Sequence, residues 1–173
     1  SLVPTAISLT TSAGRLMDIL GMPKEDYSDA EHAEKFYEEN RENGISLCIS
    51  KMSYTYHNGT RVFMRADFEA HPHEIVALVG PSGEGKTTLL RIMLALLHIQ
   101  SGDEDLVGAK TGEVLTITPA ARRLFSYVPQ GNTMFSGTIA ENMRNVRPDA
   151  TDEEIKEVLI VSCAWEFVQK LPD

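Results

Sequence analysis

Residues 80–87 read Gly80-Pro81-Ser82-Gly83-Glu84-Gly85-Lys86-Thr87 and fit the pattern G-x-x-x-x-G-K-[ST] without a substitution. This pattern predicts a loop that binds a nucleoside triphosphate together with Mg²⁺. Glycines leave room for successive backbone N–H groups to point at phosphate oxygens. The ammonium group of Lys86 would then neutralise charge on the β- and γ-phosphates, and the Thr87 hydroxyl would ligate Mg²⁺.

The segments that flank this loop favour the same interpretation. Residues 74–79 (EIVALV) predict a short buried strand, and residues 88–98 (TLLRIMLALLH) predict a helix that is buried on several sides. A strand, a glycine loop and a helix are the parts that hold phosphate at a helix N-terminus. Residues 124–128 (LFSYV) predict another buried strand. We therefore expect an α/β fold with a P-loop core and a mainly parallel sheet.

An antiparallel β portion is expected on both sides of the P-loop core. Apolar residues alternate with small polar ones from Ile45 to Ser50, and Asn58-Gly59 is a strong hairpin signal. Residues 61–70 would form the return strand of this hairpin. Residues 103–118 predict two further short strands, and Pro119 to Arg123 predict one helical turn.

Composition excludes some classes of partner. The chain has 173 residues, 42% of them hydrophobic and 24% charged, which suits one globular domain. A net charge of −9 argues against nucleic acid, because a phosphate backbone requires basic surface. The longest apolar run, residues 89–97, is interrupted by Arg91 and is shorter than a bilayer span. With no signal peptide pattern at the N-terminus, we expect the chain as given to be soluble.

The two ends of the chain differ from the middle. A loose apolar stripe predicts a helix after Pro4 that ends near residue 20. Residues 24–44 hold eight acids and three bases, and we interpret them as a linker with a solvated charged face that contains a short amphipathic helix. Near the other end, Thr151 and Glu154 form a capping-box pattern that predicts a helix to about Val161, with another over residues 164–170.

From residue 45 onward the chain resembles the nucleotide-binding domain of ABC transporters of the exporter type. Four segments carry the resemblance in the family's order: residues 52–56 (MSYTY), 74–90 (EIVALVGPSGEGKTTLL), 125–142 (FSYVPQGNTMFSGTIAEN) and Leu171-Pro172. Residues 1–20 are similar to the end of the last transmembrane helix and its cytoplasmic continuation. The resemblance implies an N-terminal helix and acidic linker over residues 1–44, which follow a membrane domain. Residues 45–173 would be a partial ATP-binding domain.

The resemblance also implies roles for individual residues. Tyr56 would stack its ring on adenine, and Gln130 would be the Q-loop glutamine that ligates Mg²⁺ or positions the attacking water. Lys86 and Gln130 would be catalytic, and Thr87 and Gln130 would hold Mg²⁺. Glu141 either contacts the membrane domain or is an ordinary acid in the first turn of a helix. The residues implied to bind ATP are Tyr56, Gly80, Pro81, Ser82, Gly83, Glu84, Gly85, Lys86, Thr87 and Thr88.

The implied function is that of the ATP-binding portion of an ATP-driven exporter at the cytoplasmic face of the membrane. Its partners would be the transmembrane domain and a second nucleotide-binding domain, identical or different. The sequence stops at Asp173, before the family's signature motif, the Mg²⁺-linked aspartate, the water-polarising glutamate and the switch histidine. We therefore expect the chain alone to bind ATP without efficient turnover.

Two other functions compete with this one. The first alternative is a regulatory module, in which ATP binding controls a partner and hydrolysis is incidental. The second is a small-molecule or nucleotide kinase that shares only the phosphate loop. The hairpin with Tyr56 ahead of the loop, and the lack of lid arginines, argue against the kinase.

Overall fold

The structure is a computed structural model that describes residues 13–131 and 133–171. It divides into two compact units, one up to Ser126 and one from Tyr127 onward. Residues 13–20 are helical, and the part of the expected first helix before residue 13 lies outside the described residues, as does Pro172. The remaining elements of the first unit are α2 (Ala30–Asn40), β1 (Ile45–Thr55), β2 (Arg61–Ala70), α3 (Lys86–Met93), β3 (Ser101–Gly108), β4 (Val114–Thr116) and the 3₁₀ helix η1 (Pro119–Leu124). The second unit contains α4 (Ile139–Arg144), α5 (Asp152–Val161) and α6 (Trp165–Val168).

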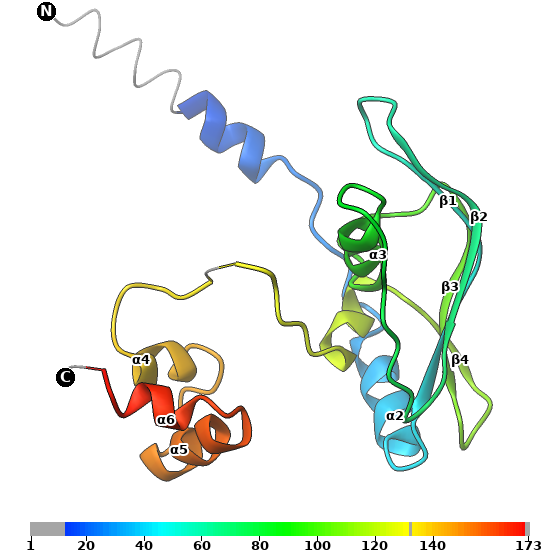
Figure 1. Ribbon diagram of the computed structural model, residues 1–173. Helices are drawn as coiled ribbons and strands as arrows, with labels where there is room; N and C mark the ends of the chain where they lie inside the picture. Colours follow the sequence, from blue (N-terminus) through cyan, green and yellow to red (C-terminus); the bar gives the residue numbers. More distant parts are fainter. Residues whose placement is uncertain (1–12, 132, 172–173) are drawn as a thin grey trace, which may run out of the picture. The chain divides into compact units, whose positions relative to one another are not determined.

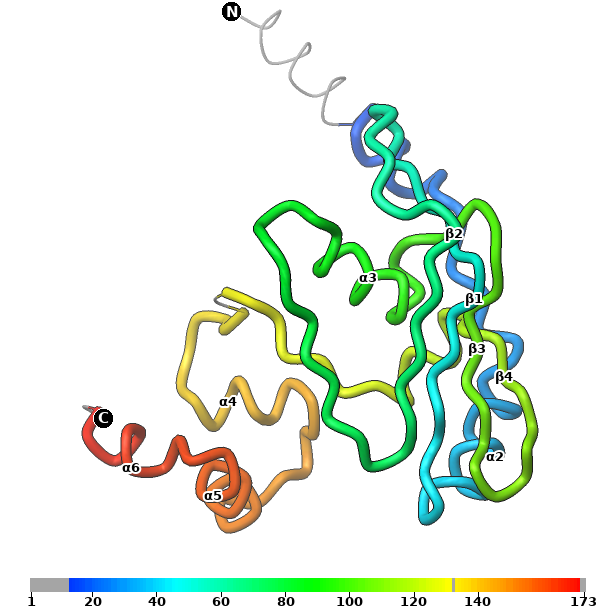
Figure 2. The backbone as a smooth tube through the Cα atoms, turned by 45° about the vertical axis from the view of Figure 1, so that its right-hand side comes forward, coloured from blue at the N-terminus to red at the C-terminus, as the bar shows by residue number. Residues whose placement is uncertain are grey.

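The first unit is built on a four-stranded antiparallel sheet with the order β2-β1-β3-β4 (Figures 1 and 2). The expected hairpin is confirmed, with β1 and β2 joined by a turn at residues 56–60 in which the Tyr56 N–H donates to the Thr60 carbonyl at 2.9 Å. The two expected strands within residues 103–118 are also confirmed as β3 and β4. The antiparallel portion predicted from the alternating pattern is therefore present.

The mainly parallel sheet predicted from residues 74–79 and 124–128 is not formed among the described residues. Neither segment is a strand, and their apolar side chains are largely exposed, as at Ile75 (97%), Val79 (88%) and Val128 (92%). A strand exists only where a neighbour completes its ladder of hydrogen bonds, and every strand pair described here is antiparallel. Residues 71–85 instead run as an irregular connection from β2 to α3 (Figure 2). The apolar content of residues 74–79 predicted a strand, but among the described residues no other strand pairs with this segment.

Helix α3 packs on the sheet through a core of buried apolar side chains. The buried members from both sides are Ile49, Met52, Tyr54, Leu89, Ile92 and Met93. The helix ends at Met93 rather than near His98 as predicted. Ala95 adopts a left-handed conformation (φ +49°), and the Leu96 N–H bonds back to the Arg91 carbonyl at 2.9 Å. This closure satisfies terminal carbonyls and turns the chain out of the helix.

The short amphipathic helix expected within residues 24–44 is confirmed as α2, which joins the same compact unit. Its Ala33 and Phe36 are buried in a second core with Leu106, Leu115 and Ala121, and Figure 1 shows α2 and α3 on the same face of the sheet. The boundary between the two compact units falls after Ser126. The helical spacing at residues 33–37 predicted the helix, but the high content of charged residues gave no sign that one of its faces is buried in a core.

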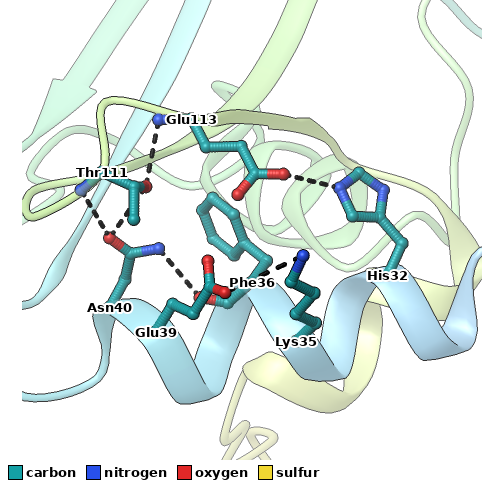
Figure 3. A network of polar contacts seen from close by, with 7 residues as sticks. All are labelled: His32, Lys35, Phe36, Glu39, Asn40, Thr111 and Glu113. Atoms are coloured by element: carbon teal, nitrogen blue, oxygen red, sulfur yellow. Dashed lines mark hydrogen bonds and ion pairs between the residues drawn. The ribbon is translucent and has the colours of Figure 1, made fainter.

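A polar network fixes α2 to the loop between β3 and β4 (Figure 3). The side chain of Asn40 is fully buried, and its oxygen accepts hydrogen bonds from the Lys110 and Thr111 N–H groups at 3.3 and 3.1 Å. Its amide donates to the Phe36 carbonyl at 2.9 Å. About two turns nearer the start of the helix, His32 Nε2 lies 2.8 Å from a carboxylate oxygen of Glu113.

The second unit is a set of three short helices. The predicted capping box at the start of α5 is confirmed: Thr151 accepts from the Glu154 N–H, and the Glu154 carboxylate accepts from the Thr151 N–H. Lys156 lies 5.1 Å from the centre of the Trp165 ring, which connects α5 to α6 by a cation–π contact. Across residues 13–131 and 133–171, none of the helices has both the length and the apolar character needed to span a bilayer.

Candidate nucleotide-binding site

The glycine-rich loop leads directly into α3, and Gly85 is the residue that makes the junction. Gly85 stands at the N-cap with φ +93°, a left-handed conformation that side chains other than that of glycine rarely adopt. A Cβ atom at this position would also lie 2.6 Å from Val62 Cγ1 and 3.0 Å from Phe63 Cζ. Conformation and close approach to β2 therefore both require glycine here.

Lys86 begins the helix and folds its side chain over the loop. Its Nζ atom donates to the Gly80 and Pro81 carbonyl oxygens, each at 2.6 Å. The ammonium group is thus held against the start of the loop that precedes it. Such a group is a compact point charge with three donors, which suits phosphate oxygens.

Next to Lys86, the two threonines differ in exposure. Thr87 is exposed, whereas Thr88 is buried. An exposed hydroxyl in the first turn fits a hard cation such as Mg²⁺, which takes oxygen ligands and keeps several of its waters. A pocket of about 310 Å³ lies against the loop and is lined in part by Phe63, Leu78 and Glu84 together with Gly85 and Lys86.

Tyr56 lies directly after β1 and reaches the start of α3. Its hydroxyl is 2.9 Å from the Thr88 hydroxyl oxygen. Its ring meets that of Tyr54 edge to face, with centroids 5.1 Å apart and planes at 84°. The structure therefore brings Tyr56 to the first turn of α3, the helix that follows the glycine-rich loop.

Gln130 and Glu141 belong to the second unit, which begins at Tyr127. Gln130 is exposed. The carboxylate of Glu141 accepts from the Thr138 N–H at 2.7 Å, and Thr138 Oγ1 accepts from the Glu141 N–H at 3.1 Å. This capping box opens α4, so Glu141 has a structural task of its own. Its contact with a membrane domain stays a prediction, as does the role of Gln130.

Sequence reasoning missed Arg122, which supports the far end of α3. Its guanidinium donates to the Leu94 carbonyl at 2.7 Å and to the Ala95 carbonyl at 3.0 Å, just after the helix ends. It also forms a bidentate pair with Glu25, which lowers the pKa of that carboxyl to about 2 with help from the Tyr27 hydroxyl. No local pattern marks Arg122, because its partners are distant in sequence.

Comparison with known proteins places this fold and loop in one family. The family model described as "ABC transporter" matches residues 63–170, which include the phosphate loop and α3. The chain therefore belongs to the ABC transporter family and is an ATP-binding region related to exporters.

Individual relatives agree with the family match. A putative export ATP-binding/permease protein of Rickettsia conorii is 29% identical over 141 residues, covering 80% of this chain and 24% of that protein. The mitochondrial iron-sulfur clusters transporter ATM1 of Debaryomyces hansenii is 36% identical over 111 residues, or 64% of this chain and 16% of that protein. A solved bacterial Atm1-family ABC exporter with ATP bound superposes with a TM-score of 0.64 at 25% identity, covering 75% of this chain and 22% of that one. The chain thus spans less than a quarter of each of these relatives.

Proposed function

We propose that this chain is the ATP-binding portion of an ATP-driven membrane exporter. The observation that carries the proposal is the intact phosphate loop at the start of α3, with Lys86 above it, inside the matched family region. In this proposal residues 80–88 hold the phosphates, and the Tyr56 ring stacks on adenine. Thr87 and Gln130 supply oxygen ligands to Mg²⁺, whose charge would offset that of the phosphates.

The partners follow from the relatives' names. Because one relative is a fused export ATP-binding/permease protein, the proposed partner is a transmembrane domain. Residues 1–44 would be the N-terminal helix and acidic linker that follow this domain. A second nucleotide-binding domain, identical or different, would pair with this one at the cytoplasmic face of the membrane. The cargo stays open, since cargo selectivity would belong to membrane helices.

Calorimetric titration with a non-hydrolysable ATP analogue and Mg²⁺ tests whether residues 80–88 hold the phosphates, an assignment called the phosphate cradle below. Lys86→Ala should weaken binding at least about tenfold, because one charge-assisted contact to phosphate contributes roughly 1.5–3 kcal/mol. Lys110→Ala is the matched control, since Lys110 is exposed in the β3–β4 loop. Binding that is equal in wild type and Lys86→Ala would contradict the assignment.

The alternative function is a regulatory module that binds ATP and hydrolyses little. Phosphate binding alone does not make an ATPase, because phosphoryl transfer to water also needs a positioned water and stabilised charge. We expect this chain by itself to bind ATP with phosphate release far below the turnover of whole transporters. A steady-state phosphate assay on wild type and Lys86→Ala distinguishes slow specific turnover from contamination. Rapid release that depends on Lys86 would refute the expected slow turnover.

A further inference from the structure

The hydroxyl groups of Tyr56 and Thr88 connect the aromatic side of the candidate site to its phosphate side. Their oxygen atoms are 2.9 Å apart, although the residues are 32 positions apart in sequence and come from the end of β1 and the first turn of α3. Thr88 is 6% exposed, so water competes poorly for its hydroxyl. A shielded hydrogen bond of this kind holds its partner more firmly than an exposed one.

Tyr54 restricts the Tyr56 ring, and the turn that follows restricts the Tyr56 backbone. The buried Tyr54 ring meets it edge to face at 5.1 Å, in a geometry that aromatic pairs favour. The backbone of Tyr56 is held by the following turn, where its N–H donates to the Thr60 carbonyl and its carbonyl accepts from the Gly59 N–H at 2.8 Å. The backbone, one flank and the tip of the side chain are therefore each fixed by a different neighbour.

We infer that Thr88 is a positioning residue that holds the Tyr56 ring ready for the adenine base, apart from any contact of Thr88 with phosphate. This inference rests on the proposed function, in which Tyr56 stacks on adenine. A ring held in one orientation before binding does not pay the entropy of being ordered by the ligand. A threonine hydroxyl has one donor and two acceptor sites, so Thr88 can bond Tyr56 and still reach a phosphate oxygen.

A double-mutant cycle with two ligands tests the inference. Tyr56→Phe and Thr88→Val each remove one hydroxyl and keep the shape of the side chain, and Thr88→Ser keeps the hydroxyl. Calorimetry would compare each variant's affinity for ATP with its affinity for inorganic tripolyphosphate, which has no base to stack. Tyr37→Phe on α2 is the matched control, since Tyr37 lies outside the site. Thermal melts by circular dichroism would confirm that each variant folds.

We expect the variants that lose a hydroxyl, Tyr56→Phe and Thr88→Val, to lose the preference for ATP over tripolyphosphate. Tyr56→Phe should lower ATP affinity about threefold to tenfold, the effect of one immobilised side chain, and leave tripolyphosphate affinity within about twofold. In the Thr88→Val background, Tyr56→Phe should have no further effect on ATP binding. Thr88→Ser and Tyr37→Phe should retain the wild-type preference.

Other outcomes would overturn the inference and show where it fails. Equal loss of both ligands in Thr88→Val, or effects of the two variants that multiply, would make Thr88 a phosphate contact only. If wild type bound ATP no better than tripolyphosphate, the stacking role of Tyr56 itself would be wrong. If neither ligand bound, the phosphate cradle would be wrong. If Thr88→Val does not fold, the test compares the preference for ATP over tripolyphosphate in Tyr56→Phe and in Thr88→Ser. The inference requires that Tyr56→Phe loses this preference and that Thr88→Ser keeps it.

Discussion

Arg122 forms two parallel hydrogen bonds with the carboxylate of Glu25, at 2.9 and 2.7 Å, while the same guanidinium donates to the carbonyls that end α3. The acidic segment before α2 is therefore tied to the helix whose other end holds the phosphate loop. Bidentate pairing fixes the planar guanidinium in direction as well as in distance. Arg122 thus contacts Glu25, which is 97 positions away in the sequence, and also the end of α3.

Loss of this arginine should destabilise the first unit. In Arg122→Ala the Leu94 and Ala95 carbonyls, both in buried residues, lose their side-chain donor, and we expect a loss of about 1–3 kcal/mol in the free energy of unfolding. Urea unfolding measures it. Arg123→Ala is the control, because Arg123 pairs with Glu34 on exposed side chains and should change little. Equal effects of both substitutions would show that charge, and not the helix end, matters.

Asn40→Ala should detach the β3–β4 loop from α2. The substitution leaves the Lys110 and Thr111 N–H groups without their acceptor, which should cost about 2–3 kcal/mol. Hydrogen exchange at these two amides should rise together with the loss of stability. Asn43→Ala, at an exposed position just past the helix, is the matched control. Unchanged protection in Asn40→Ala would mean that the loop is held by other contacts.

Glu104 should make stability depend on pH. Burial, with a smaller contribution from the charge of Asp105, raises its pKa from 4.5 to about 7, and one carboxylate oxygen lacks a hydrogen-bond partner among the described residues. The folded state then keeps a proton that the unfolded state has released, so stability falls as pH rises from about 4.5 to 7.

Glu104→Gln removes this titration and tests it. At pH 8 the variant should be more stable than wild type by up to about 3 kcal/mol, and at pH 4 the two should be similar. Urea unfolding at several pH values measures both. Asp103→Asn, on an exposed neighbour in β3, should leave the pH slope of wild type unchanged. A slope that persists in Glu104→Gln would assign the pH dependence to other groups.

Gly85→Ala should damage both stability and nucleotide binding. The new Cβ would contact Val62 and Phe63 in a left-handed backbone, and the two penalties together should amount to about 2–4 kcal/mol. Gly112→Ala is the matched control, since Gly112 has φ +70° with open space around it and carries only the backbone penalty. If the two variants lost the same stability, the close approach to β2 would be unimportant.

Local patterns sufficed where the interacting residues are neighbours in sequence. The Asn58-Gly59 turn, the Thr151–Glu154 capping box and the loop at residues 80–87 were each predictable, because a few consecutive residues set the backbone geometry. The same holds for the family, which short motifs in order identify. The expected strand at residues 74–79 failed for the opposite reason, since a strand requires a distant partner.

By itself, the sequence determined the glycine-rich loop, the hairpin and the family of this protein. Only the tertiary structure decided that α2 belongs to the core, that Arg122 donates to the Leu94 carbonyl just past α3, and that Thr88 meets Tyr56. These contacts join residues 28 or more positions apart, and periodicity and capping rules describe only neighbours along the chain. Which distant groups meet depends on how helices and strands pack, and that is a property of the folded chain.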